Sequence, residues 1–539
     1  MMSQLKSKID ALLFNPQLSQ AISRWSSKVL IVSVGMTVIV LGIRQLGGLQ
    51  SLELQAFDYL VRQRPNEPED KRLLIVGFTD EDINKKIPYP ISDQKLAEIL
   101  EKLQQYEPAV IGVDIFRDIP IGEGNETLNK TFEEANTTII MPCGMSDAEK
   151  NSGVKPPSSI PSEQVGFANK DPDSDAIIRR SILVSSPPSL DKPYPDKHLC
   201  NDPQQILSSF PFLISQYYFP EDIQIDPPTD TTPLKIGKIA FQRLESNAGG
   251  YQNLKASDYQ ILLNYRSSQS PSRIVSISEL LNNQVAPELI KNNVVLVGYT
   301  GTSFKDTFPT PYNRNSDTPG VVIHAQIVSQ IISAVEDNRP PQILYFPELG
   351  EWLWIWGWAV LGGLLTWPKL KPTGLVITAI VVMVGGLCVV CYAGLFFWAY
   401  WLPLIPSVLV LVGTSTTVLW IERIRIAPEM DWDGIREEET KKKGQAEKTA
   451  RQEFLKQLAE KADELKREAI DFNMEEIQDS LPFERLKSSY MDNYLNKLAL
   501  KAQQMRDNWR ILTEKPFEQK KASIRTLVKK SQYLRSKFD

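Results

Sequence analysis

Histidine is scarce in this sequence: the 539 residues contain two, and residues 422–539 contain none. That C-terminal segment therefore has no residue that could take part in a phosphohistidine relay. It also lacks a glycine-rich phosphate loop, the HRD and DFG motifs of a kinase and the paired aspartates of a nucleotide cyclase. These absences exclude the usual catalytic output domains of signalling receptors, and we expect the protein not to be an enzyme.

Charged side chains are missing from several long stretches. Residues 29–43 are uncharged and short for a membrane span, but the flanking Lys28 and Arg44 can extend their charged ends to the bilayer surface. No small-x-small cleavage site follows, so we favour an uncleaved anchor over a signal peptide. The pattern predicts four transmembrane helices, because the uncharged run 372–421 is long enough for two spans joined by a hairpin. Their predicted bounds are 29–43, 349–368, 374–397 and 403–421.

The distribution of charge predicts the orientation of these spans. Lys369 and Lys371 lie in the short loop between two spans, and Arg423 and Arg425 follow the last one. Cytoplasmic loops are enriched in Lys and Arg, so this pattern places both termini in the cytoplasm. The predicted domains are then a cytoplasmic segment 1–28, an outer domain 44–348 that is periplasmic or extracellular, and a cytoplasmic tail 422–539.

The four cysteines fall into two groups. Cys143 and Cys200 lie in the outer domain, where an oxidising environment permits a disulfide. Spacing alone leaves open whether they pair or remain two buried thiols. Cys388 and Cys391 form a CxxC within an apolar run that has no second ligand pair, so we interpret them as packing residues rather than zinc or redox ligands.

The outer domain alternates buried strands with amphipathic helices. Continuous apolar runs bounded by polar residues are typical of strands in a parallel sheet that is covered on both faces. We therefore predict an α/β domain with a mostly parallel sheet covered by helices. A stretch rich in Pro, Ser and Asp, about 146–203, is expected to form loops. The predicted strands are 73–78, 109–116, 137–143, 259–266 and 292–299.

Polar residues lie at the carboxyl ends of three of these strands: Asp80 follows the first, Asp114 lies within the end of the second, and Thr300, Lys305 and Asp306 follow the last. In parallel α/β sheets, ligands bind beyond the carboxyl ends of the strands. We therefore predict a ligand site formed by Asp80, Asp114, Thr300, Lys305 and Asp306. The alternative is that these side chains only cap helices and turns. Whether such a carboxylate cluster holds a metal ion is left open, and no cofactor is expected.

Two other motifs are interpreted structurally. Asp171, Asp173 and Asp175 imitate the start of a calcium loop, but the glycine and the later glutamate of that loop are missing, so a turn is predicted. His324 lies in an apolar helical pattern and is expected to be a satisfied packing residue rather than a ligand.

The cytoplasmic tail has a helical pattern and is predicted to be all-α. Residues 441–470 form a long amphipathic pattern with Leu458, Leu465 and Phe472 at seven-residue spacing. Both a short coiled coil and a small helical bundle fit this stripe.

The outer domain resembles the second class of CHASE domains, which are extracellular sensory modules of bacterial receptors. The resemblance rests on several stretches in the family's order, and the three downstream spans match its layout. It implies a bacterial inner membrane protein, yet this chain departs from the family by lacking the usual cyclase or kinase domain. The matching stretches are LELQAFDYLVRQRP, LLIVGFTDEDI, VIGVDIFRDIPIG, VGFANKDPDSDAIIRR, YQILLNYR, VVLVGYTGTSFKDTFPTPY and PGVVIHAQIVSQIISAVEDNRP.

We therefore expect a receptor that binds an unidentified ligand outside the membrane and signals to a cytoplasmic protein through residues 422–539. Two alternatives are a membrane scaffold without a small ligand and an outer-face hydrolase that uses Asp80, Asp114 and Asp306. A homo-oligomer remains open, the lipid bilayer is an expected partner, and no nucleic-acid partner is expected.

Overall fold

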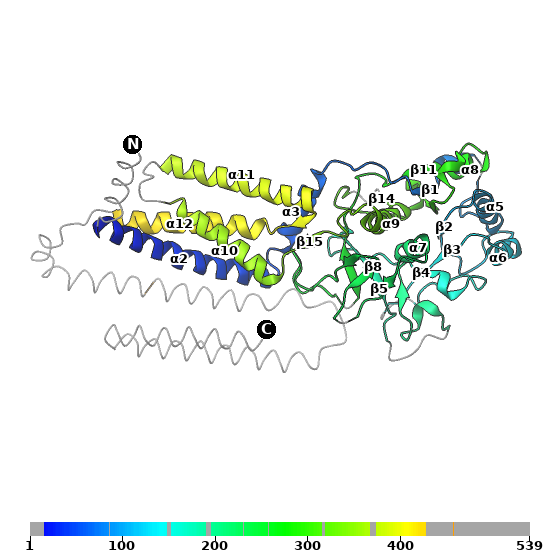
Figure 1. The fold of residues 1–539 in the computed structure, drawn as a ribbon, viewed down its shortest axis with the longest axis horizontal. Coiled ribbons are helices and arrows are strands. Elements are labelled where there is room, and N and C mark those ends of the chain that lie inside the picture. The colour runs from blue at the N-terminus through cyan, green and yellow to red at the C-terminus, as the bar shows by residue number, and fades with distance from the viewer. Residues whose placement is uncertain are drawn as a thin grey trace, which may run out of the picture. The chain divides into compact units, whose positions relative to one another are not determined.

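The structure is a computed structural model that describes residues 16–426, except positions 86, 148–151, 190–195, 230, 257, 315–317 and 367–372, together with position 456. The predicted all-α tail therefore lies outside the described residues. The described residues between 16 and 426 belong to one compact unit, in which an α/β domain adjoins a group of long helices (Figure 1).

A six-stranded sheet forms the centre of the α/β domain. Its strands lie in the order β11-β1-β12-β2-β3-β4, and every neighbouring pair is parallel. The fully apolar composition of β1 and β12 explains their central position, because both faces of a parallel sheet are covered. The strands are β1 (Leu73–Phe78), β2 (Val110–Asp114), β3 (Ile139–Cys143), β4 (Val165–Phe167), β11 (Arg273–Ser276) and β12 (Val294–Tyr299).

Helices cover both faces of this sheet, as predicted. Alternate side chains of β1 point to opposite faces: Leu74 and Val76 belong to one hydrophobic cluster, and Leu73 and Ile75 belong to another. The first face carries α4 (Asp80–Asn84), α5 (Asp93–Gln104), α6 (Asn125–Glu133) and α8 (Ile277–Leu281). The second face carries α7 (Phe210–Tyr218) and α9 (Gly320–Glu336).

Two parts of the sequence prediction need correction. The run 259–266 contains β10 (Tyr259–Leu262), which pairs antiparallel with β5 (Arg180–Ser185) in a separate sheet rather than joining the parallel one. A continuous apolar run indicates that a strand is buried, but it does not indicate whether the strand pairs parallel or antiparallel with its neighbour. The stretch 146–203, predicted as loops, supplies both β5 and the edge strand β4.

Short strands complete the domain. They are β6 (Leu207–Ser208), which pairs with β5, the antiparallel set β7 (Ile225–Asp226), β8 (Leu234–Ile236) and β9 (Ile239–Phe241), and the pair β13 (Thr307–Phe308) and β14 (Thr318–Pro319). A further pair, β15 (Leu344–Tyr345) and β16 (Tyr400–Trp401), joins the outer domain to the connection between two long helices.

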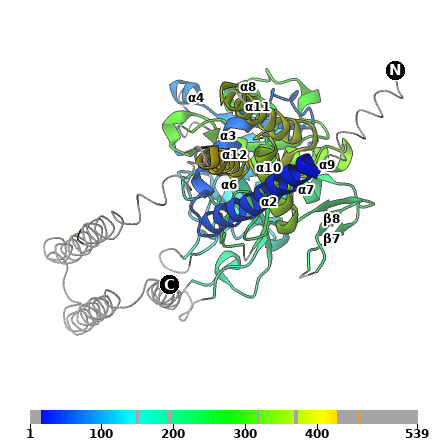
Figure 2. The same ribbon diagram turned by 90° about the vertical axis from the view of Figure 1, so that its left-hand side faces the viewer.

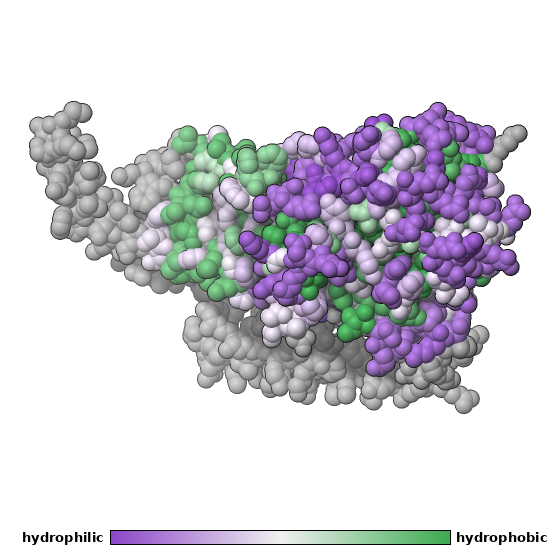
Figure 3. All heavy atoms as spheres, turned by 45° about the vertical axis from the view of Figure 1, so that its right-hand side comes forward, coloured by the Kyte–Doolittle hydropathy of each residue, from purple (hydrophilic) through white to green (hydrophobic). Residues whose placement is uncertain are grey.

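Four long helices lie side by side (Figures 1 and 2): α2 (Pro16–Gln45), α10 (Glu348–Leu364), α11 (Thr373–Trp398) and α12 (Ile405–Ile426). A fifth helix, α3 (Gln50–Arg62), follows α2 directly. Hydrophobic side chains dominate the surface of the long helices, whereas hydrophilic ones dominate the α/β domain (Figure 3).

Two of these helices are long and apolar enough to cross a membrane, namely Trp25–Gln45 and Gly374–Trp398. Only 22% and 17% of their most apolar windows are buried, so most of the apolar surface faces outward. The sequence predicted four spans. By length and composition, two helices among the described residues are long enough to span a membrane. The other two are shorter: α10 has 17 residues, and the apolar part of α12 is Ile405–Ile421.

Candidate functional site

Asp80 lies at the predicted edge of the sheet but faces a turn. It is the first residue of α4, directly after β1 and the capping residue Thr79. Its carboxylate accepts hydrogen bonds from the Ser303 backbone N–H and the Thr302 hydroxyl, both at 3.4 Å. Asp80 therefore holds the turn that follows β12.

Asp114 and Asp306 come together around a lysine that the sequence analysis did not select. The Lys170 ammonium contributes a favourable charge to both carboxylates. The close approach takes place at Gly320, where an added Cβ would lie 2.6 Å from Asp306 Oδ2 and 2.9 Å from Lys170 Nζ. Burial raises the pKa of Asp114 and of Asp306 above its ordinary value, although Lys170 opposes this rise.

His324 completes this cluster from the second turn of α9. Its Nε2 lies 3.6 Å from Asp114 Oδ1, and its ring packs edge-on against Phe210. Burial, and secondarily Lys170, lowers the pKa of His324 well below 6.5, so the ring is neutral. His324 is buried as predicted but is not satisfied, because neither ring nitrogen has a hydrogen-bond partner among the described residues.

The remaining predicted residues do not join this cluster. The Thr300 hydroxyl donates to the Phe78 carbonyl at 3.3 Å and so braces two neighbouring strands. Lys305 is exposed, in a left-handed conformation with φ of 57°, and it makes no hydrogen bond or ion pair through its side chain within the described ranges. Lys170, rather than Lys305, therefore supplies the positive charge.

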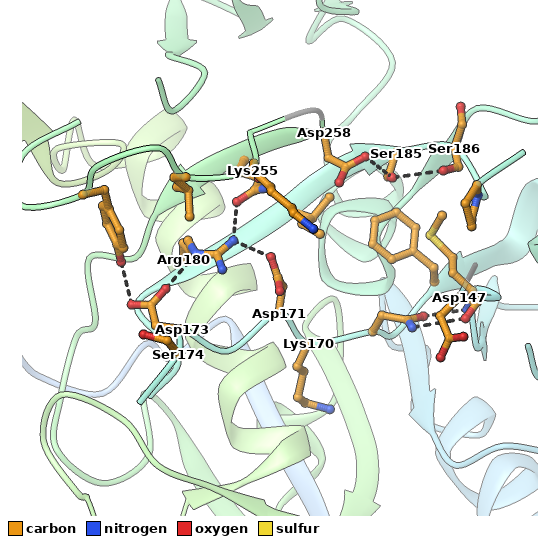
Figure 4. Close-up of a pocket in the computed structure, with 18 of the residues that line it drawn as sticks. Asp147, Lys170, Asp171, Asp173, Ser174, Arg180, Ser185, Ser186, Lys255 and Asp258 are labelled. Carbon is orange, nitrogen blue, oxygen red and sulfur yellow. Dashed lines mark hydrogen bonds and ion pairs between the residues drawn. The ribbon is translucent and has the colours of Figure 1, made fainter. Parts of the chain in front are cut away.

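Lys170 also lines a pocket with a volume of about 780 Å³ (Figure 4). One wall is the loop after β4, with Lys170, Asp171 and Asp173, and another is the antiparallel sheet of β5 and β10. Arg180 on β5 lies between them: its guanidinium donates to Asp171, to Asp173 at 2.8 Å and to Gln260 at 2.5 Å.

A buried ion network extends from this pocket to α3. Arg179 is fully buried and donates two hydrogen bonds to Asp58 of α3, at 2.7 and 2.9 Å. It also contacts Asp173 at 2.6 Å and Asp175 at 2.7 Å. The DPDSD segment is thus a turn, as predicted, but its carboxylates serve the two arginines that follow it.

Glu53, in the first turn of α3, binds the start of α12. The buried Glu53 carboxylate accepts hydrogen bonds from the indole N–H of Trp401 at 3.2 Å and from the backbone N–H groups of Leu404 at 2.9 Å and Ile405 at 2.7 Å. A carboxylate at the N-terminus of a helix satisfies otherwise unpaired N–H groups and complements the helix dipole.

Trp401 packs directly against the pocket wall. Its ring lies over Gly249 and Gly250, where an added Cβ would approach the indole to 2.5 and 2.8 Å. It also contacts the ring of Tyr251, whose hydroxyl donates to Asp173 at 2.7 Å. Tyr251, a residue of the pocket, therefore contacts both the ion network and Trp401 of β16, which lies between α11 and α12.

The ends of α2 and α10 are tied to the same region. Arg44 forms a buried ion pair with Glu351 and donates to the Gly249 carbonyl at 2.6 Å. Both side chains are almost completely buried. The loop that carries Gly249 and Tyr251 thus contacts α2 through Arg44 and the connection between α11 and α12 through Trp401.

Cys143 and Cys200 form a disulfide in the structure, with their Cα atoms 6.3 Å apart and both residues buried. The bond joins the end of β3 to the short helix Leu199–Asn201. Cys388 and Cys391 are free thiols.

A family model described as the CHASE2 domain matches residues 35–364, which is more than half of the chain. The chain belongs to the CHASE2 family. CHASE2 domains are extracellular sensory domains rather than catalytic ones, in agreement with the resemblance seen in the sequence. Comparisons with curated proteins and with solved structures gave no match.

The CHASE2 match begins within α2 and ends with α10, so it includes α3 and the whole outer domain. Lys170, Arg179 and Arg180 all lie in the stretch VGFANKDPDSDAIIRR. In the sequence, these residues are recognisable because three aspartates at alternate positions are followed by a pair of arginines. That pattern indicates paired charges, but the sequence does not reveal that Asp58 is their partner.

Proposed function

We propose that the protein is a sensor of the bacterial inner membrane, whose CHASE2 domain binds a ligand outside the cytoplasm. In this proposal, α2, α10, α11 and α12 all span the membrane, both termini are cytoplasmic, and residues 422–539 pass the signal to a cytoplasmic protein. The family match supports the sensory role, and the apolar helices support membrane anchoring.

The four-span arrangement rests on packing as well as composition. A helix of 17 residues is at the short end of the range that crosses a bilayer. Helices α10 and α12 both pack against α2, and Gly362 approaches the Leu411 carbonyl of α12 so closely that an added Cβ would lie 2.3 Å from it. Small residues at such contacts are characteristic of helices that associate in membranes.

The observation that carries the proposal is the position of α3 between the pocket and α12. Asp58 on this helix binds Arg179 of the ion network, and Glu53 on the same helix holds the first N–H groups of α12. A ligand that prefers one arrangement of the pocket shifts the population of that arrangement. Because α3 is a single helix, a shift at Asp58 also displaces the start of α12.

Double electron–electron resonance, which measures the distance between two spin labels, tests the connection from Asp58 through α3 to α12 on the full chain in nanodiscs. Spin labels are placed at Leu30→Cys and Trp420→Cys, both exposed positions on α2 and α12, after replacement of the free Cys388 and Cys391 by alanine. Glu53→Ala removes the acceptor of three hydrogen bonds and is expected to shift the mean distance between the labels by roughly 1–2 Å, the scale of helix shifts in switching proteins.

Glu348→Ala is the matched control, because Glu348 is an exposed carboxylate in the first turn of α10. It should leave the distance distribution unchanged. A Glu53→Ala distribution that superimposes on that of the parent would contradict transmission through α3 and would favour a scaffold that passes no signal.

A further inference from the structure

The cluster of Asp114, His324, Asp306 and Lys170 lacks contacts that buried polar groups ordinarily make. Among the described residues, both ring nitrogens of His324 and the Oδ2 atom of Asp114 have no hydrogen-bond partner. The closest approach of the two side chains, 3.6 Å between His324 Nε2 and Asp114 Oδ1, is longer than a hydrogen bond. Since most buried polar atoms in proteins are paired, these atoms need a partner that the described residues do not supply.

Lys170 turns its charge toward this cluster. Figure 4 shows its side chain directed away from Lys255. The ammonium lies 4.9 Å from the centre of the Phe308 ring, which is a favourable cation–π distance. It also lies beside Asp306 at Gly320, where the missing side chain leaves room for both groups. Lys170 is therefore placed to respond to the charge of the buried carboxylates.

The charges of the cluster do not balance when both carboxylates are ionised. Asp114 and Asp306 then carry two negative charges, Lys170 carries one positive charge, and the neutral His324 carries none. Helix α7 contributes only the uncharged ring of Phe210 to this site. No other charged side chain among the described residues acts on Asp114 or His324. One added proton makes the cluster neutral, and an uncompensated buried charge is costly.

We propose that Asp114 is a proton-binding site that makes the outer domain responsive to pH, with the neutral His324 ring as the hydrogen-bond acceptor of the protonated carboxyl. The proton comes from water at low pH and returns to water as the pH rises. Burial raises the pKa of Asp114 and lowers that of His324, so the carboxyl rather than the ring holds the proton. This inference goes beyond the proposed function, because it requires neither a ligand in the pocket nor transmission through α3.

Loss of the proton changes the forces on the loop after β4. While Asp114 is neutral, the Lys170 ammonium faces the single carboxylate of Asp306. Once Asp114 is ionised, both carboxylates attract this ammonium. The same loop carries Asp173, which binds the buried Arg179. A shift of Lys170 is therefore expected to reach the buried ion network.

The scarcity of histidine makes the site directly observable. Histidine labelled with nitrogen-15 gives signals from two imidazole rings in the full chain, and His198→Gln identifies those of His198. Nuclear magnetic resonance of the protein in nanodiscs follows both rings between pH 4.5 and pH 8. The His324 ring is expected to stay neutral, while its Nε2 resonance moves in one step as Asp114 loses its proton. In Asp114→Asn the step should be lost and Nε2 should keep its low-pH position, because the amide also donates a hydrogen bond.

Two lysine variants test the effect of charge on this step. Lys170→Met should raise the pH midpoint by about 1 pH unit or more, because a nearby positive charge lowers the pKa of a carboxyl. Lys255→Met is the matched control, since Lys255 lines the same pocket but Lys170 points away from it (Figure 4). Lys255→Met should leave the midpoint unchanged, as should Asp118→Asn at an exposed carboxylate beyond β2. Thermal unfolding shows that each variant retains its fold.

Amide hydrogen exchange tests the response of the loop. At pH 8, residues 168–178 should exchange more slowly in Asp114→Asn than in the wild type, because Lys170 is drawn to one carboxylate in the variant and to two in the wild type. At pH 4.5 this difference should be lost, since Asp114 is then neutral in both proteins. Each comparison is made at one pH, which removes the intrinsic pH dependence of exchange.

The proposal is overturned if the His324 resonances do not change with pH, if the ring becomes doubly protonated in this range, or if the step persists in Asp114→Asn. It is also overturned if Lys170→Met titrates at the wild-type midpoint, or if the loop exchanges equally in both proteins at pH 8. The distance measurement on Glu53→Ala is made at a single pH and does not involve this proton. Failure of the proton site is therefore distinguishable from failure of the proposed function.

Discussion

Replacing Arg179 by methionine removes the centre of the buried ion network while keeping a side chain of similar length. In the native protein the guanidinium contacts Asp58, Asp173 and Asp175, and neither Arg179 nor Asp58 is exposed to solvent. After the change, Asp58 keeps only Arg314, at 2.8 Å, as an ion-pair partner among the described residues. Asp173 keeps Arg180 and the hydroxyl of Tyr251.

Breaking a buried ion pair from one side destabilises a protein by about 3–5 kcal/mol, because the remaining charge stays buried without compensation. A domain of roughly this size loses about 2–4 °C of melting temperature for each kcal/mol. We therefore expect Arg179→Met to lower the unfolding temperature by about 6–20 °C. The burial of both partners makes this estimate appropriate, since solvent screens exposed pairs much more strongly.

Thermal unfolding followed by circular dichroism on the purified full chain measures this effect. Asp58→Asn alone and the double variant complete a mutant cycle. The double variant should lose less than the sum of the two single losses, because neither charge is then left unpaired. Arg273→Met, at an exposed position on the edge strand β11, serves as the control and should change stability by less than about 0.5 kcal/mol. Additive losses, or an Arg179→Met loss no larger than that of the control, would refute the reasoning.

Two further predictions concern the outer domain. Cys143 and Cys200 should both escape thiol-specific mass tagging in the denatured, unreduced protein, and both should be tagged after reduction; two tagged thiols before reduction would rule out the disulfide. Burial raises the pKa of Asp114, so the folded state holds this proton more tightly than the unfolded state, and stability is lost as the pH rises from the ordinary pKa of an aspartate through the raised pKa. Asp114→Asn should therefore increase the unfolding temperature more at pH 8 than at pH 4.5, and an equal shift at both pH values would contradict this account.

The sheet was predictable where the sequence is uniformly apolar. The run LLIVGF coincides with β1, and VVLVGY coincides with β12, because a strand buried on both faces leaves a continuous apolar signal. Strand β4 has three residues within a polar stretch, too few for any periodic pattern, and was missed. Strand β10 was recognised as buried, but pairing direction depends on its neighbour and not on its own composition.

The candidate site was predictable only in part, for a related reason. Asp114 is the last residue of β2 and Asp306 follows the neighbouring strand β12, so strand order alone brings them to one edge of the sheet. Lys170 reaches them from the loop after β4, a strand that the sequence did not reveal. Asp58 pairs with Arg179 across 121 positions, and such a contact has no local signature in a single sequence.

The membrane arrangement of the outer domain and the tail is tested most directly by alkaline phosphatase fusions, since this enzyme is active only outside the cytoplasm. A fusion after residue 250 places the reporter in the CHASE2 domain, and a fusion after residue 430 places it beyond α12. The account predicts an active enzyme at the first site and a silent one at the second. Activity at both sites would contradict it, because the tail would then lie on the same side of the membrane as the sensory domain.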